Sequence, residues 1–160
     1  MVVETDSAAC TRALGEALGR SAEPNTVIGL RGPLGAGKST LAQGIARGLG
    51  VTEPVSSPTF NLVQEYAGRL PFWHVDAYRI RSLDEIIDLS LPELLQGGGV
   101  VVIEWSERLA RALPADRLEA HLTVLEGDRR RIWLEPLGPR SRDLLERARH
   151  ELRPCSLVDR

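Results

Sequence analysis

One short segment, Gly32-Pro-Leu-Gly-Ala-Gly-Lys-Ser39, constrains the fold of this 160-residue chain more than any other feature. It matches the pattern G-x-x-x-x-G-K-[ST] at every fixed position. The apolar run at 26–30 precedes it, and residues 41, 45 and 49 after it are apolar at helical spacing, up to Gly50. A strand, a glycine-rich loop and a helix are therefore predicted over 26–50. Main-chain N–H groups of such a loop can converge on phosphate, because glycines remove the obstructing side chains.

The residue types in this loop indicate a nucleoside triphosphate and magnesium. Backbone N–H groups from Gly35 through Ala36 and Gly37 to Lys38 would surround the phosphates, and the following helix adds its positive N-terminal end. The Lys38 ammonium would lie beside the β and γ phosphates, and the Ser39 hydroxyl would bind Mg²⁺. Thr40 is predicted to reach the α phosphate. The chain has no N-K-x-D element of the kind that reads guanine, so ATP and ADP are the expected nucleotides.

Composition favours one globular, cytoplasmic domain over residues 1–160. Hydrophobic residues make up 42% and charged residues 26%, and 20 basic against 22 acidic residues exclude a broadly cationic nucleic-acid clamp. Neither a membrane-spanning segment nor a secretory signal is expected. Cys10 and Cys155 have no metal-like or redox-like spacing and are interpreted as incidental thiols of a reducing compartment. Residues 141–160 are predicted to form a helical, partly flexible C-terminal tail.

The rest of the chain predicts an α/β fold with a parallel central sheet and antiparallel hairpin additions, a three-layer sandwich like that of P-loop NTPases. Helices are expected over residues 1–20, where Asp6 or Ser7 can cap, and over 83–95 with a break at Pro92. Two more are expected over 106–113 and from Ser141, the last with fraying after Pro154. Strands at 59–66 and 70–76 are expected to pair as one hairpin, and those at 117–125 and 130–137 as another. The continuous apolar run at 100–105 is typical of a strand buried on both faces.

Two strand-end carboxylates complete the predicted site. Glu104 follows four apolar residues in the run at 100–105, at the edge where open α/β sheets bind ligands, and Asp76 closes the strand at 70–76. Either could join the magnesium shell, and Glu104 could instead hold or deprotonate the attacking water. Trp105 is expected near the nucleotide or a docked partner.

Several nearby side chains allow more than one interpretation. Arg79 could meet phosphate or pair with a carboxylate, and His74, alone on an apolar strand, is interpreted as structural. The role of Tyr78 stays open. Ser57 and Thr59 could sense the γ phosphate through a hydroxyl, although a proline-rich connector is the simpler interpretation of that segment.

Four segments occur in order, namely GPLGAGKST, VSSPTFNLVQEY, HVDAYR and VVIEWSE. Together they resemble the TsaE (YjeE) family of bacterial P-loop ATPases, from about Thr11 to Trp133. The resemblance implies a role in the threonylcarbamoyl modification of adenosine 37 in tRNAs that read ANN codons. It also implies two partner proteins, TsaB and TsaD. TsaD performs the transfer, and ATP hydrolysis by TsaE resets the complex.

The resemblance also implies roles for single residues. Lys38 and Ser39 would bind phosphate and magnesium, Thr40 would belong to the nucleotide pocket, and Thr59 corresponds to a switch-like threonine. The functional carboxylates would be Asp76 and Glu104, and Trp105 would be a sensitive position near the nucleotide. Ser39 stands where the family usually has threonine, which keeps the hydroxyl. Ser106 stands where proline is common, and this is expected to loosen the turn after Trp105.

Hydrolysis is expected to be slow in the isolated protein and stimulated by partners. The chain shows no obvious arginine finger and no strong general base beyond Glu104 and Asp76, and such missing contacts are worth ~10³–10⁵ in rate. The alternatives are a small-molecule kinase and a nucleotide-gated binding module that does not require hydrolysis. The tRNA is expected to be an indirect partner, which this protein need not contact itself. Direct contact through residues 129–131 stays open, since such an arginine run is more typical of a solvated hairpin edge.

Overall fold

A computed structural model describes residues 1–56 and 62–152, and the strands in these ranges form one seven-stranded sheet. The strands are β1 (Val2–Thr5), β2 (Thr26–Arg31), β3 (Val63–Ala67), β4 (Pro71–Asp76), β5 (Val100–Glu104), β6 (Leu118–Val124) and β7 (Arg130–Pro136). Their order across the sheet is β1-β7-β6-β2-β5-β4-β3. The four central strands β6, β2, β5 and β4 are parallel, and β3, β7 and β1 are antiparallel additions.

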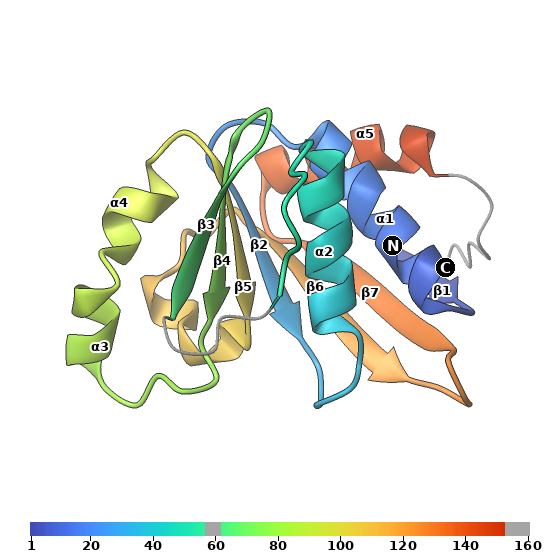
Figure 1. Cartoon of the computed structure of the whole chain (residues 1–160), viewed down its shortest axis with the longest axis horizontal. Helices are drawn as coiled ribbons and strands as arrows, with labels where there is room; N and C mark the ends of the chain where they lie inside the picture. The colour runs from blue at the N-terminus through green and yellow to red at the C-terminus, as the bar shows by residue number, and fades with distance from the viewer. Residues whose placement is uncertain (57–61, 153–160) are drawn as a thin grey trace.

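Helices cover both faces of this sheet (Figure 1). They are α1 (Ala8–Ser21), α2 (Lys38–Gly48), α3 (Leu83–Asp88), α4 (Leu91–Leu95), α5 (Pro139–Glu151) and the 3₁₀ helices η1 (Ser106–Arg108) and η2 (Ala110–Ala112). One core cluster joins α1, α2 and α5 to the sheet, and a second joins residues of β2, β4 and β5 to the segments at 86–95 and 105–113. The predicted three-layer α/β class with a parallel centre is confirmed.

The parallel centre places the carboxyl ends of β2, β4 and β5 at one edge. All five residues of β5 are buried, as a strand covered on both faces requires. Asp76 of β4 is directly opposite Glu104 of β5, and Leu30 of β2 is opposite Glu104 on the other side. The glycine-rich loop leaves β2 at this edge, so both predicted carboxylates lie beside it.

Glycines hold α2, the helix after the loop, closely against α1. A Cβ added at Gly15 would lie 2.5 Å from the Leu41 carbonyl oxygen and 2.8 Å from the Gly44 Cα. Gly19 faces the Ile45 carbonyl in the same way. The backbones of α1 and α2 are therefore in close contact at these glycines, and the two helices lie side by side in Figure 1. Larger side chains at these positions would push α2 and its loop away from α1.

The predicted helix over residues 1–20 is wrong at its start. Residues 2–5 form β1, which pairs with β7 in the register Val2↔Trp133, and α1 begins only after Ser7. The Ser7 hydroxyl accepts a hydrogen bond from the Cys10 N–H at 3.1 Å, as a helix cap does. Pairing with β7, which lies near the other end of the sequence, determines β1, and no local pattern signals such pairing.

Other predicted boundaries also shift. The break in the 83–95 segment lies at Ser90, which has φ 52°, and Pro92 occupies the first turn of α4, where proline is tolerated. The segment at 106–113 forms two 3₁₀ turns in place of one helix. Of the strand expected at 59–66, the described part is Val63–Ala67, which ends one residue later than expected, and α5 begins two residues before Ser141.

Some predictions fall on residues 57–61 and 153–160, which the structure does not describe. They are the candidates Ser57 and Thr59, the fraying after Pro154, and Cys155, whereas Cys10 is buried on α1. Within the described ranges, no helix has both the length and the apolar character needed to cross a membrane.

Candidate nucleotide site

The loop between β2 and α2 has the backbone that its glycines were expected to permit. Gly35 and Gly37 have φ values of 79° and 101°, in the left-handed region that favours glycine. A Cβ added at Gly35 would meet nothing within 4 Å, so this part of the loop faces open space. Gly37 caps α2 without a side chain, which leaves the first-turn N–H groups for a ligand. Such a helix terminus binds anions.

Lys38, the first residue of α2, lies inside this loop. Its side chain is buried, and Nζ donates to the carbonyl oxygens of Gly32 at 2.5 Å and Pro33 at 2.9 Å. The ammonium also lies 4.2 Å from the centre of the Trp105 ring. Burial lowers the pKa of Lys38 because it penalises the charged form, while the nearby carboxylates, Glu104 above all, oppose this shift. The loop therefore holds its cation where phosphate oxygens would replace carbonyl oxygens.

Glu104 faces α2 from the end of β5. The Ser39 hydroxyl lies 3.3 Å from Oε1 and 3.4 Å from Oε2 of this buried carboxylate. Asp76 projects into the same cavity from the end of β4, and its Oδ1 accepts a hydrogen bond from the Tyr78 N–H at 2.9 Å. The two carboxylates and the hydroxyl that were predicted to serve magnesium are thus neighbours.

His74 contacts Glu104, a contact that the structural interpretation of this residue did not anticipate. The ring is fully buried, and its Nε2 lies 2.6 Å from Oε2 of Glu104. Its Nδ1 is the one buried side-chain polar atom of the described residues without a hydrogen-bond partner. A proton on Nδ1 would have no acceptor, so we place the ring proton on Nε2, where Glu104 accepts it. His74 therefore fixes one carboxylate oxygen of Glu104.

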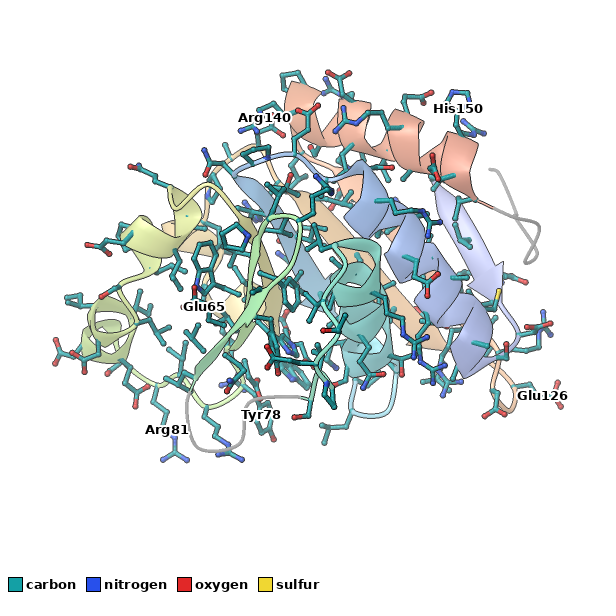
Figure 2. The ribbon with its side chains drawn as sticks, turned by 45° about the horizontal axis from the view of Figure 1, so that its top comes forward. Glu65, Tyr78, Arg81, Glu126, Arg140 and His150 are labelled. Carbon is teal, nitrogen blue, oxygen red and sulfur yellow. The ribbon has the colours of Figure 1, made fainter. Side chains whose placement is uncertain are left out.

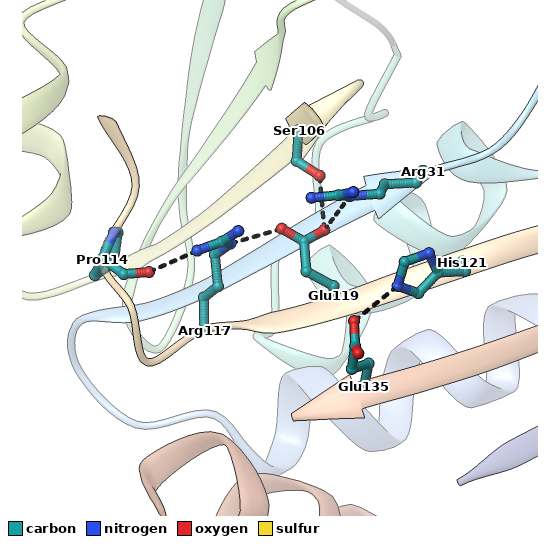
Figure 3. A network of polar contacts seen from close by, with 7 residues as sticks. All are labelled: Arg31, Ser106, Pro114, Arg117, Glu119, His121 and Glu135. Carbon is teal, nitrogen blue, oxygen red and sulfur yellow. Dashed lines mark hydrogen bonds and ion pairs between the residues drawn. The ribbon is translucent and has the colours of Figure 1, made fainter. Parts of the chain in front are cut away.

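Trp105 continues from Glu104 in a left-handed backbone conformation, with φ 60°. Its ring packs on Lys38 and lies 5.0 Å from the ring of Tyr78. The expected loosening of the following turn is wrong. Ser106 is buried, and its hydroxyl donates to Oε2 of Glu119 at 2.7 Å (Figure 3). This hydrogen bond anchors the turn to β6.

A cavity of about 530 Å³ lies over the loop, and most of the predicted residues line it. They are Gly35, Gly37, Lys38, Ser39, Thr40, Asp76, Glu104 and Trp105. Ala36 is buried within the loop and does not line the cavity, and Thr59 lies outside the described residues. Arg79 and Tyr78, on the loop after β4, line it as well, and Figure 2 labels Tyr78 at this edge of the molecule.

Arg130 also lines the cavity, and sequence reasoning missed this placement. It comes from the first position of β7, and its Nη2 donates to the Gly35 carbonyl oxygen at 3.1 Å. The only sequence signal was the three-arginine run at 129–131, which did not reveal which arginine faces the loop. That choice depends on how β7 pairs with its neighbours.

The oxygen ligands present fit a magnesium ion that arrives with phosphate. Among the described residues, no group of three or more histidine, cysteine or acidic side chains could hold a metal ion by itself. The hydroxyl of Ser39 and the carboxylates of Glu104 and Asp76 are hard oxygen ligands. Magnesium in nucleotide sites is typically held by one or two carboxylates together with water and phosphate oxygens, which is the set that this cavity could complete.

The chain is similar to proteins of one family. Residues 5–132 match the model of the family described as threonylcarbamoyl adenosine biosynthesis protein TsaE. The TsaE protein of Treponema pallidum is 43% identical over 126 residues, which cover 79% of this chain and 93% of that protein. The TsaE protein of Bacillus subtilis is 40% identical over 143 residues, covering 88% and 89%. The crystal structure of B. subtilis YdiB superposes with a TM-score of 0.81 at 34% identity and covers 95% of this chain and 96% of that one.

Proposed function

Because the chain belongs to the TsaE family, we propose that it is the ATP-hydrolysing component of tRNA threonylcarbamoyladenosine biosynthesis. It would act in the cytoplasm with TsaB and TsaD, and its hydrolysis of ATP to ADP and phosphate would reset their complex. The observation that carries this proposal is the contact of Ser39 with Glu104, beside a loop built for phosphate. That contact places a hydroxyl and a carboxylate where the terminal (γ) phosphate of a bound triphosphate and its magnesium ion would lie in this proposal.

Each residue of the site has a distinct chemical task in this proposal. Main-chain N–H groups from Gly35 to Lys38 bind the β and γ phosphates, and the Lys38 ammonium leaves the loop carbonyls to meet them. Ser39, Glu104 and Asp76 would hold magnesium, which when bound neutralises charge that develops on the phosphate oxygens.

The Ser39 hydroxyl lies between the two oxygens of Glu104, 3.3 Å from Oε1 and 3.4 Å from Oε2, while His74 contacts Oε2 alone. In this proposal the Glu104 carboxylate, held by His74, would bind the metal or accept a proton from water. Trp105 packs on Lys38 and covers one side of the ammonium, which excludes water from it. The geometry is consistent with either task for Glu104, and both depend on its being ionised.

ATP turnover by the purified protein tests the proposal. With magnesium we expect slow hydrolysis alone and a rise of at least 10³-fold with TsaB and TsaD, since supplied transition-state contacts are worth ~10³–10⁵ in rate. The Glu104→Gln variant is expected to bind ATP and both partners but to lose turnover and cellular function. Equal rates with and without the partners would contradict the proposal.

The same variant separates the proposal from its alternatives. If Glu104→Gln keeps cellular function, the protein acts as a nucleotide-gated binding module and hydrolysis is incidental. If a phosphorylated metabolite accumulates faster than free phosphate, the protein is a small-molecule kinase.

A further inference from the structure

Three successive arginines, Arg129, Arg130 and Arg131, begin β7, and they differ in what they contact. Arg131 donates to Oε1 of Glu4 at 2.8 Å, and Arg129 donates to Oε2 of the same carboxylate at 3.1 Å. The contacts described for Arg130 are all to carbonyl oxygens, those of Gly35, Gly127 and Arg129. Within residues 1–56 and 62–152, Arg130 is therefore the one member of the run with no carboxylate partner.

The strand register explains why Arg130 turns to the other side. Side chains alternate along a strand, so Arg131 lies on one face of β7 with its cross-strand neighbour Glu4. Arg130 is opposite Thr5 of β1 and Val124 of β6, and it faces the side on which the phosphate loop lies. In Figure 1 the loop between β2 and α2 and the turn between β6 and β7 reach the same end of the molecule.

The Arg130 guanidinium has donors to spare at the wall of the cavity. Its Nη1 donates to Gly127 and Arg129 at 2.9 Å each, and Nη2 donates once, to Gly35. A guanidinium has five N–H groups, so in the described part of the chain two of them lack an acceptor. The bonds to its own turn hold the group in place without neutralising its charge.

The charges of the cavity favour more than one cation beside a bound triphosphate. Its cationic side chains are Lys38, Arg79 and Arg130, and its acidic ones are Asp76, Glu104 and Asp128. Asp76 and Glu104 face the proposed metal, and a triphosphate adds more negative charge than the single ammonium of Lys38 can balance. Arginine suits this task, because its planar fork of donors matches phosphate oxygens.

We propose that Arg130 is a phosphate-binding residue of the nucleotide site, supplied by the β6–β7 turn. This inference rests on the proposed function, since it assumes that the loop binds ATP or ADP. The guanidinium keeps its hold on the turn and uses its remaining N–H groups, and the one now on Gly35, to bind the phosphate chain. Binding of the nucleotide thereby joins the β6–β7 turn to the phosphate loop.

A purely structural role would be to support the loop through the Gly35 carbonyl. Two substitutions separate these roles, because glutamine keeps an N–H donor without the charge, whereas lysine keeps both a donor and the charge. Arg129→Gln is the matched control. It removes a neighbouring exposed arginine that pairs with Glu4 on the opposite face.

The experiment is calorimetric titration of wild type and the Arg130→Gln, Arg130→Lys and Arg129→Gln variants with ADP and with ATP, magnesium present. Arg130→Gln is expected to weaken binding about 10- to 100-fold, the value of a hydrogen bond to a charged group. Arg130→Lys should recover part of this loss, and Arg129→Gln should bind like wild type. Lower ionic strength should enlarge the difference between wild type and Arg130→Gln.

Each outcome has one meaning. If wild type binds nucleotide and Arg130→Gln binds it equally well, Arg130 is not a phosphate ligand and the proposed function stands. If both variants weaken binding and Arg130→Lys binds no better than Arg130→Gln, the charge of Arg130 does not bind phosphate and this inference is overturned. If wild type binds neither ADP nor ATP, both the proposed function and this inference are overturned.

Discussion

Glu119 lies in β6 beneath the turn that carries Trp105, and its replacement by glutamine tests how that turn is held. The side chain is 1% exposed and accepts hydrogen bonds from Arg117 Nε at 2.6 Å, Ser106 Oγ at 2.7 Å and Arg31 Nε at 3.1 Å (Figure 3). One buried carboxylate therefore serves two guanidinium groups and the hydroxyl that anchors the turn. Glutamine keeps the shape and one acceptor oxygen but removes the charge.

The size of the loss follows from the burial of the partners. Removal of one member of a buried ion pair costs about 3–5 kcal/mol, since the other charge is left uncompensated. The Arg117 side chain is 11% exposed, whereas that of Arg31 is 30% exposed and can regain water. The lower end applies, and Glu119→Gln is expected to lower the free energy of unfolding by about 3 kcal/mol at pH 7. For a chain of this size that is about 6–12 °C in Tm.

The loss should depend on pH in a defined direction. Burial alone would raise the pKa of Glu119, but the hydrogen bonds from Arg117 and Ser106 and the charge of Arg31 outweigh burial and lower it below 4.5. The unfolded chain then binds the proton more readily than the folded chain. The stability from Glu119 is complete above about pH 4.5 and is lost as the pH falls through the lower, folded-state pKa.

Urea denaturation followed by circular dichroism at pH 7 and at acidic pH measures both effects. The control is Glu135→Gln. Glu135 is the cross-strand neighbour of Glu119 on β7 and contacts His121 at 3.1 Å, at the surface. This control should cost less than 1 kcal/mol. A loss below 1 kcal/mol for Glu119→Gln at pH 7, or a wild-type advantage that stays constant as the pH falls below 4, would refute the reasoning.

Three further substitutions address the loop and Glu104. Gly15→Ala would raise the free energy of unfolding by about 1 kcal/mol from helix propensity alone, but overpacking against Leu41 and Gly44 costs about 1–3 kcal/mol. Urea denaturation should therefore show a net loss of stability. A gain would disprove the close contact of α1 and α2. Lys38→Met should abolish ATP binding in calorimetry yet stabilise the unliganded protein by about 1 kcal/mol, because a buried charge is removed. The stability advantage of Lys38→Met over wild type should shrink as the pH rises toward 10.5. The folded wild type, with its lowered Lys38 pKa, loses that proton before the unfolded chain does, so wild type gains stability over this range. A variant that is less stable than wild type without ligand would contradict this prediction. His74→Leu should lower kcat for ATP about 10-fold with little change in KM, whereas His74→Gln, which keeps an N–H donor, should retain most of the turnover. Equal kcat in wild type and both variants would mean that His74 does not position Glu104.

The parts of the site that follow from local spacing could be predicted from the sequence. The glycine loop with Lys38 and Ser39 is one contiguous motif, and the apolar run at 100–104 identifies a buried strand that ends in Glu104. Parallel strands bring their carboxyl ends to one edge, so the approach of Asp76 to Glu104 also followed from the pattern.

The parts that depend on pairing between distant segments could not be predicted in this way. The strand β1 exists because it pairs with β7, and that same pairing decides that Arg130 faces the loop while Arg131 faces Glu4. His74 could have been found, since strand alternation puts it on the same face as Asp76, two residues on. A lone histidine on an apolar strand is more often structural, and the alternation alone does not show that Glu104 lies within reach of its ring.

These distant contacts end on the loop, on the helix that follows it, or on the turn beside it. The glycine contacts of α1 hold α2, Arg130 from the second hairpin holds the Gly35 carbonyl, and Ser106 ties the Trp105 turn to Glu119. A proline after Trp105 would restrain the turn through its own ring, but this chain has Ser106 there. Here a hydroxyl bonded to a buried carboxylate provides the restraint, so the geometry around Lys38 depends on the charge of a residue in β6. The loop motif supplies the groups that bind phosphate, whereas their positions are determined by segments from both ends of the chain.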